Sequence, residues 1–205
     1  MSGDARIDLP KIVALGPAGV NPMRVRADAN NAWQRPIEAG LFLKSLCYPF
    51  AAIEEPVHAG DREGQHLIAT ATGATIILDE SLRNVEHLVD YAGVDFAWLA
   101  NIRISKLGGL IRSLDIARRA ASLGAGIIVG AQLGETSLLT RAALAVAHAM
   151  RDNLYAQEGA YGRLLLSHDV IAAPIQFGQG GMLAARDVPN QPGFGLSVTD
   201  IRARS

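Results

Sequence analysis

Short apolar runs of strand length alternate with amphipathic stretches along the whole chain. The runs lie at residues 24–27, 51–53, 75–78, 96–102 and 126–129, and a sixth strand is predicted at 153–157. Most runs are apolar at consecutive positions, as strands covered on both faces of a parallel sheet are. Between them, the spacing of apolar residues predicts helices over 37–46, 62–72, 84–92, 110–123 and 136–150. This alternation predicts an α/β fold whose parallel strands are joined by right-handed crossovers.

Polar side chains recur where the predicted strands end. Asp28, Glu54, Asp79 and Arg103 follow one another at intervals of about 25 residues, and Glu158 comes about two intervals later. One βα unit has this length, so these side chains take equivalent places in successive units. In a (β/α) barrel such places form a ring around the C-terminal mouth, where the active site lies. The spacing therefore favours a barrel over an open sheet, which would distribute the same side chains along a line.

The number of predicted strands is smaller than a closed barrel requires. A barrel of this kind has eight strands, whereas this sequence predicts about six. We therefore expect a partial (β/α) barrel over residues 1–166, with an amphipathic helix in about the first 20 residues. Residues 167–205, rich in Gly and Pro, are expected to pack on the barrel or on a capping domain. Because exposed strand edges pair readily with other chains, we expect a fragment, a homo-oligomer or a chain that a partner completes.

Composition narrows the class of partners. The chain has 205 residues, 49% of them hydrophobic and 19% charged, with a formal net charge of -1. This is typical of a globular protein, and the near-zero charge argues against nucleic acid or an anionic membrane as the main partner. The sequence opens without a signal-peptide pattern and has no membrane-spanning apolar run, so we expect a soluble, cytoplasmic protein. Its sole cysteine, Cys47, excludes a disulfide framework and is expected to be a packed thiol.

Asp28, Glu54 and Asp79 form a set of oxygen donors. Mg²⁺ prefers carboxylates together with water and substrate oxygens, whereas zinc sites usually include His or Cys. A single acidic residue at a strand end could equally cap the helix that follows. Three acidic residues at equivalent places in consecutive units favour a magnesium site instead.

Four segments, in this order and spacing, resemble the enolase superfamily: Asp28-Ala29-Asn30, Ile53-Glu54-Glu55-Pro56, Leu78-Asp79-Glu80-Ser81 and Lys106-Leu107-Gly108-Gly109. The likeness is closest to its mandelate racemase and muconate lactonizing enzyme branch. The resemblance implies a modified barrel with a capping domain. It also implies a Mg²⁺ ion that stabilises the enediolate formed when a base removes the proton α to a substrate carboxylate.

The same resemblance assigns roles to individual residues. It implies that Asp28, Glu54 and Asp79 are the metal ligands, since in the family the first acid of the Glu-Glu-Pro segment binds the metal. The neighbouring Glu55, Glu80 and Asn30 are then expected to support the ligands or to begin helices.

Two departures from the family pattern concern the catalytic bases. In the muconate branch a catalytic lysine lies where this chain has Arg103, and a Lys-x-Lys pair on the second barrel strand has no counterpart in this sequence. A guanidinium stays protonated near neutral pH, so Arg103 is expected to bind or polarise the substrate. Proton transfer would then fall to Lys106 or to Glu158, which resembles the acid at the end of the eighth strand. Either residue could instead be paired with a neighbouring charge.

Together these features predict a magnesium-dependent enzyme acting on a small carboxylate substrate. It would be a racemase or epimerase, a cycloisomerase or an acid dehydratase. The alternative is a truncated, non-catalytic metal-binding remnant or one subunit of a split enzyme. Gln132 or Glu135 could also reach the mouth from the loop after residues 126–129, although Glu135 could equally begin the next helix.

Overall fold

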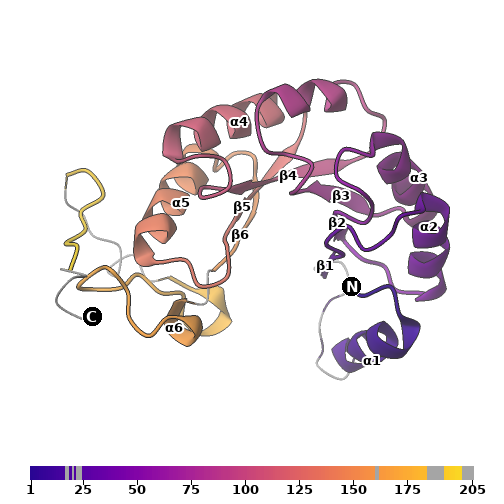
Figure 1. The fold of residues 1–205 in the computed structure, drawn as a ribbon, viewed down its shortest axis with the longest axis horizontal. Coiled ribbons are helices and arrows are strands. Elements are labelled where there is room, and N and C mark those ends of the chain that lie inside the picture. The colour runs from indigo at the N-terminus through magenta and orange to yellow at the C-terminus, as the bar shows by residue number, and fades with distance from the viewer. Residues whose placement is uncertain (17–18, 20, 22–24, 160–161, 184–191, 200–205) are drawn as a thin grey trace. The chain divides into compact units, whose positions relative to one another are not determined.

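The computed structural model describes residues 1–205 except 17–18, 20, 22–24, 160–161, 184–191 and 200–205. The chain forms two compact units, one of residues 1–101 with 122–126 and the other of residues 102–121 with 127–205. Figure 1 shows the order of the helices and strands along the chain. Residue 24, where the first strand is predicted to begin, lies outside the described residues. The division expected at residue 166 stays a prediction.

The first unit is built on short parallel strands. β1 (Arg26–Asp28) pairs with β2 (Ala52–Glu54), β2 pairs with β3 (Thr75–Leu78), and β3 pairs with β4 (Trp98–Arg103). The last two residues of β4 belong to the second unit. Ile53, Ile76 and Ile77 are completely buried, as the consecutive apolar positions of these strands predict.

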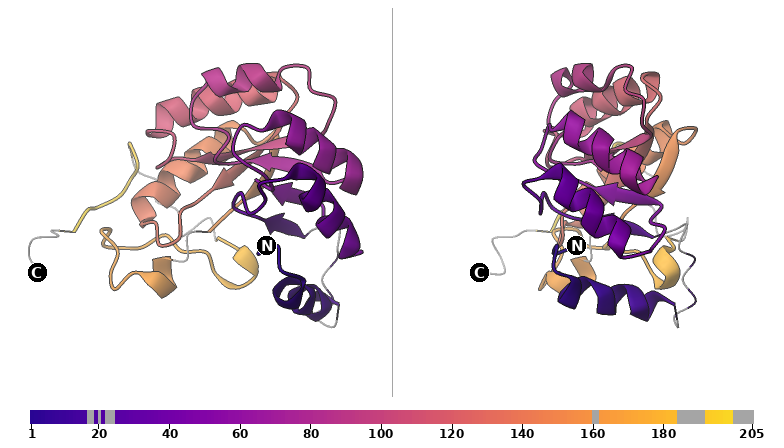
Figure 2. Two further views of the ribbon diagram at one scale, coloured as in Figure 1. Left: turned by 45° about the vertical axis from the view of Figure 1, so that its right-hand side comes forward. Right: turned by 90° about the vertical axis from the view of Figure 1, so that its right-hand side faces the viewer.

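Two helices pack side by side in the first unit, α2 (Pro36–Ser45) and α3 (Arg62–Thr72), and α3 contacts β3 (Figures 1 and 2). Pro36 begins α2 at the first helical turn, where its missing N–H group is not needed. The Asp61 carboxylate accepts a hydrogen bond from the N–H of Gly64 and so caps α3. Gly73 ends α3 in the left-handed conformation, at a φ of 71°.

The helix predicted over 84–92 is present, but it is a 3₁₀ helix, η2 (Glu86–Tyr91). The N–H of Leu88 donates to the carbonyl of Val85, and the N–H of Ala92 donates to that of Val89. These three-residue spacings wind the backbone more tightly than an α-helix. The helix expected in the first 20 residues is present as α1 (Ala5–Leu15), but Leu9 and Val13 are exposed, so the apolar face of this helix is not buried.

Cys47 is exposed, so the prediction of a packed thiol is wrong. It lies just beyond the C-terminal end of α2 and adopts a left-handed backbone conformation, with a φ of 49°. Its N–H donates to the carbonyl of Lys44, which closes the last turn of the helix. The chain reverses at this point and directs the thiol to solvent.

The second unit contains the C-terminal elements. These are α4 (Leu110–Ser122), β5 (Gly126–Gly130), α5 (Ser137–Ala149), β6 (Leu154–Gln157), α6 (Gly162–Leu165) and η3 (Gln179–Gly181), with Ser122 and Gly126 belonging to the first unit. β5 and β6 are parallel, with a register shift between Ile127 and Ile128, and β6 confirms the sixth predicted strand. No helix of the described ranges is both long and apolar enough to cross a membrane.

The close packing of α3 against the start of α2 generates a first prediction. A Cβ atom at Gly64 would lie 2.6 Å from Cγ of Pro36 and would clash with the Asp61 carboxylate that caps the helix. Gly64→Ala should therefore lower the free energy of unfolding by about 1–3 kcal/mol. Gly16→Ala is the matched control, because a Cβ atom there comes no closer than 3.7 Å to its neighbours. Equal urea midpoints for the two variants would contradict this packing.

Asp8 joins the N-terminal residues to α1. Its side chain is completely buried and accepts hydrogen bonds from the N–H groups of Ser2 and Gly3, and Lys11 Nζ lies 3.2 Å from Oδ1. Burial opposes ionisation, but these hydrogen bonds outweigh it and hold the pKa of Asp8 below its ordinary value.

A pH-dependent contribution to stability follows from Asp8. Because its folded-state pKa is lowered, Asp8 stabilises the fold above its unfolded pKa, which is about 4, and this contribution is lost as the pH falls through the lower folded value. Asp8→Asn should cost about 1–3 kcal/mol at neutral pH and progressively less on acidification. Urea unfolding across this pH range, with the exposed Asp90→Asn as control, measures the effect. A difference from wild type that does not change with pH would contradict it.

Candidate active site

Three carboxylate residues lie at the C-terminal ends of three neighbouring strands in the first unit. Asp28 is the last residue of β1 and Glu54 the last residue of β2, and the two are direct Cα partners in the parallel pairing. Glu54 is in turn the partner of Ile77, so Asp79 lies just beyond the end of β3 on the same edge. The structure thus brings the three predicted metal ligands to one edge of the sheet.

The three carboxylates differ in their exposure to solvent. Glu54 is 7% exposed and Asp79 is 1% exposed, whereas Asp28 is exposed. The Asp28 Oδ1 atom accepts a hydrogen bond of 2.9 Å from the N–H of Asn30. Two of the acids are therefore shielded from water. In such a buried environment a negative charge needs hydrogen-bond partners or a cation to be stable.

Asn101 contacts Glu54, and the sequence pattern does not predict this contact. Its Nδ2 group donates a hydrogen bond of 2.7 Å to Oε1 of Glu54, and its side chain is 2% exposed. It lies on β4, among the buried apolar residues of that strand. An amide in an otherwise apolar strand is the signal that could have identified it, because a buried amide requires hydrogen-bond partners.

Glu55, the residue after β2, binds the segment that follows β3. Its Oε1 atom accepts hydrogen bonds from the N–H groups of Asp79 and Ser81, at 2.6 and 2.7 Å. The side chain is completely buried. Glu55 therefore contacts the predicted ligand Asp79 by accepting a hydrogen bond from its backbone N–H group.

The three predicted ligands offer the oxygen donors that Mg²⁺ prefers, and they lie at the ends of consecutive strands. Their side chains do not, however, converge into a closed cluster. Among the described residues, no group of three His, Cys, Asp or Glu side chains is arranged to hold a metal ion. Asp28, Glu54 and Asp79 nevertheless present only oxygen donors from consecutive strands, which is the ligand chemistry of a hard divalent cation.

The other predicted site residues belong to the second unit. Arg103 ends β4, and its Nη1 group donates a hydrogen bond of 3.2 Å to Oε1 of Gln132, on the loop after β5. Lys106 is partly exposed in the turn that follows β4. Glu158 directly follows β6, and its N–H donates to the carbonyl of Val129. The structure therefore brings Arg103 and Gln132 together within this unit.

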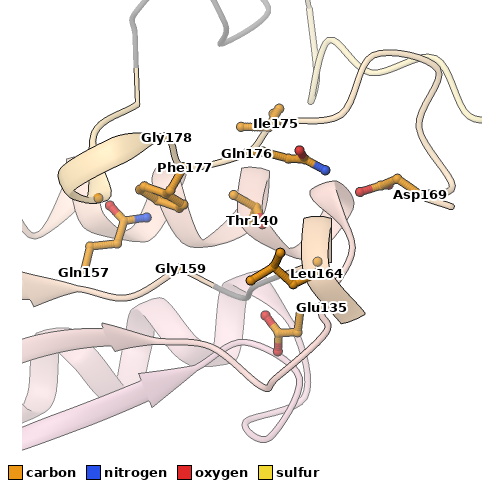
Figure 3. Close-up of a pocket in the computed structure, with 12 residues that line it drawn as sticks. Glu135, Thr140, Gln157, Gly159, Leu164, Asp169, Ile175, Gln176, Phe177 and Gly178 are labelled. Carbon is orange, nitrogen blue, oxygen red and sulfur yellow. The ribbon is translucent and has the colours of Figure 1, made fainter. Parts of the chain in front are cut away.

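A cavity of about 250 Å³ also lies in the second unit (Figure 3). Its lining includes Glu135, Thr140, Gln157, Asp169 and Phe177. Glu135 accepts a hydrogen bond of 2.7 Å from Oγ of Ser105, so its carboxylate bridges the loops that follow β4 and β5. Glu135 precedes α5 without capping it, because the residue at the N-cap position is Thr136.

Comparison with known proteins assigns this arrangement to a class. Residues 6–202 match the family model described as "Enolase C-terminal domain-like". The chain is 30% identical over 200 residues to muconate cycloisomerase 1 of Pseudomonas putida, with 95% of this chain and 50% of that protein covered. The chain spans about half the length of the curated relatives it matches.

Solved structures show the same fold. The N-succinyl Arg/Lys racemase from Bacillus cereus ATCC 14579 matches with a TM-score of 0.81 at 22% identity, over 97% of this chain and 52% of that one. The dipeptide epimerase from Enterococcus faecalis V583, complexed with Mg and the dipeptide L-Leu-L-Tyr, matches with a TM-score of 0.71 at 25% identity. That match covers 86% of this chain and 49% of the epimerase chain.

The fold class is therefore the one expected, an α/β fold that corresponds to part of a (β/α) barrel and carries acidic residues at its strand ends. The chain belongs to the enolase superfamily, in its mandelate racemase and muconate lactonizing enzyme branch. This confirms the family resemblance found in the sequence segments.

Proposed function

We propose that this chain provides the metal-binding part of a magnesium-dependent enzyme that removes the proton α to a substrate carboxylate. The observation that carries the proposal is the placement of Asp28, Glu54 and Asp79 at one edge of three consecutive parallel strands. Relatives named as a cycloisomerase, a racemase and an epimerase support this reaction class. A small carboxylate is the substrate class that the chemistry requires.

The three acids would hold the cation at this edge, and Asn101 would keep one oxygen of Glu54 in a fixed orientation. A bound Mg²⁺ would supply positive charge that offsets the negative charge developing on the substrate carboxylate after proton loss. Burial of Glu54 and Asp79 favours this role, because electrostatic attraction is stronger where water is excluded.

Arg103 would bind the substrate carboxylate and would not act as the base. Its guanidinium is positively charged at all ordinary pH values, and Gln132 holds one of its N–H groups. Proton transfer is then proposed for Lys106, in the turn after β4, or for Glu158, directly after β6. Either group would accept a proton only from a substrate placed within hydrogen-bond reach.

Magnesium binding tests the metal site directly. Wild-type chain titrated with Mg²⁺ in a calorimeter should bind one equivalent saturably, and Glu54→Gln should weaken the binding by at least about tenfold, because it removes a charged ligand. Glu63→Gln makes the same chemical change at an exposed position on α3 and should bind as wild type does. Binding that is absent, or that does not depend on Glu54, would contradict the proposed site.

The role of Arg103 is tested by exchange of the substrate α-hydrogen in deuterium oxide. Over a panel of hydroxy and amino carboxylates followed by NMR, Arg103→Gln should raise KM roughly 10–100-fold, the cost of one charge-assisted hydrogen bond. The pH dependence of kcat should be unchanged, since a guanidinium group does not exchange its proton with the substrate as a base would. A shifted or abolished pH dependence at unchanged KM would show that Arg103 takes part in proton transfer.

A further inference from the structure

A buried network of hydrogen bonds connects the helical layer of the first unit to the backbone of Asp79. The Tyr91 hydroxyl donates to Oε1 of Gln65 at 2.8 Å, and Nε2 of Gln65 donates to Oγ of Ser81 at 3.2 Å. Ser81 Oγ donates to Oε2 of Glu55 at 2.8 Å. All of these side chains are at most 4% exposed. The network ends at the Glu55 carboxylate, which also accepts the N–H group of Asp79.

The hydrogen-bonding capacity of Ser81 fixes the direction of the network. A hydroxyl group has one hydrogen to donate and two lone pairs that accept. Its lone pairs are taken by the N–H of Gly60, at 2.9 Å, and by Nε2 of Gln65. The single hydroxyl hydrogen must therefore point to Glu55, whose two oxygens act only as acceptors in this network.

The same reasoning extends to Tyr91. Because Gln65 uses its amide nitrogen on Ser81, its oxygen faces Tyr91 and requires a protonated hydroxyl there. Burial raises the pKa of Tyr91 to about 12, and the negative charge of Glu55 adds to the increase. Tyr91 is thus a permanent donor at neutral pH, and every donor in the network is directed toward Glu55.

Glu55 also has an uncommon backbone conformation. Its φ is 36°, in the left-handed region, and its N–H donates to the carbonyl of Ile77 on β3. A residue other than glycine adopts this conformation only where surrounding contacts compensate its cost. Here the compensation is the set of three hydrogen bonds that the carboxylate makes to Asp79 and Ser81.

We propose that Glu55 is a positioning residue that fixes Asp79 relative to Glu54, and that Ser81, Gln65 and Tyr91 lock Glu55 in this role. The inference rests on the proposed function, because it concerns two of the proposed magnesium ligands. Glu54 and Glu55 are adjacent on one strand end, so a carboxylate that binds the backbone of Asp79 sets the spacing between neighbouring ligands. Groups that orient metal ligands in this way commonly affect metal affinity 10–100-fold.

Glutamine cannot replace Glu55 without leaving a polar group unsatisfied. If the amide oxygen of Gln keeps the two backbone N–H groups, its nitrogen faces Ser81 Oγ, whose lone pairs are already occupied. If the amide is reversed, its nitrogen faces the N–H groups of Asp79 and Ser81. In both orientations two donors oppose each other in a buried site, which is costly.

Amide hydrogen exchange of the metal-free 205-residue chain tests the network without relying on activity. In Glu55→Gln, the amides of Asp79 and Ser81 should exchange at least about tenfold faster than in wild type, because either orientation of the Gln amide sets two buried donors against each other and so weakens the contacts that hold this turn. The amide of Ile76, bonded to the carbonyl of Ala97 in the same unit, is the internal reference and should not change. Glu63→Gln, at an exposed position, should leave all three amides unchanged.

Magnesium affinity measured on the same variants completes the test. Glu55→Gln should weaken Mg²⁺ binding roughly 10–100-fold, and Tyr91→Phe, which removes only the outermost donor, should weaken it a few-fold. If Glu55→Gln does not fold, the exchange rates of the Asp79 and Ser81 amides in Tyr91→Phe decide the test. The inference would be overturned if the amides of Asp79 and Ser81 exchange at the wild-type rate. It would also be overturned if they exchange faster while the affinity for Mg²⁺ stays that of wild type. A wild type that binds no Mg²⁺ while the amides respond as expected would overturn the proposed function and the ligand role, but would leave the Glu55 contacts established.

Discussion

The buried carboxylate of Glu55 is the constraint on which the proposed metal site depends. It lies on the strand end that carries Glu54 and binds the turn that carries Asp79, so two proposed ligands are held through one carboxylate. A buried charge is stable only when it is fully hydrogen-bonded, and the network from Tyr91 through Gln65 and Ser81 supplies part of that bonding. The conformation at φ 36° is one consequence of this arrangement.

The three proposed ligands differ in their exposure to solvent, and this difference bears on how they would bind a cation. Glu54 and Asp79 are buried and held by Asn101 and Glu55, whereas Asp28 is exposed at the end of β1. Two of the proposed ligands are thus held by neighbouring groups, and the third is accessible from solvent. Donors that are already held would reduce the reorganisation that accompanies cation binding.

The sequence predicts the position of the site more completely than its internal contacts. The repeat of about 25 residues between Asp28, Glu54 and Asp79 identifies equivalent places in successive βα units, because parallel strands of similar length end at the same edge. That prediction requires only local patterns. The hydrogen bond between Asn101 and Glu54 joins residues 47 positions apart, and no local pattern encodes it. The exposure of Cys47 was missed for a related reason, since it depends on the left-handed turn at the end of α2.

The helix predicted over 84–92 illustrates the same limit. Apolar residues recur there at helical spacing, but the backbone forms the 3₁₀ helix η2, which ends at Tyr91. Tyr91 is anchored by its hydrogen bond to Gln65 and by packing against the ring of Trp98, at a centroid distance of 5.5 Å. These tertiary contacts occur where the helix type departs from the local pattern. They also explain why Tyr91 was not identified as part of the site, because its link to Asp79 passes through three other side chains.

We propose that the ends of β1, β2 and β3 form one divalent-cation site. Its most direct test is a crystal structure of the chain grown with Mn²⁺ in place of Mg²⁺, with anomalous scattering recorded at the manganese edge. We expect a single strong anomalous peak within coordination distance of carboxylate oxygens of Asp28, Glu54 and Asp79, and its loss in Glu54→Gln crystals. A peak elsewhere, or an ordered site without one at saturating Mn²⁺, would contradict it.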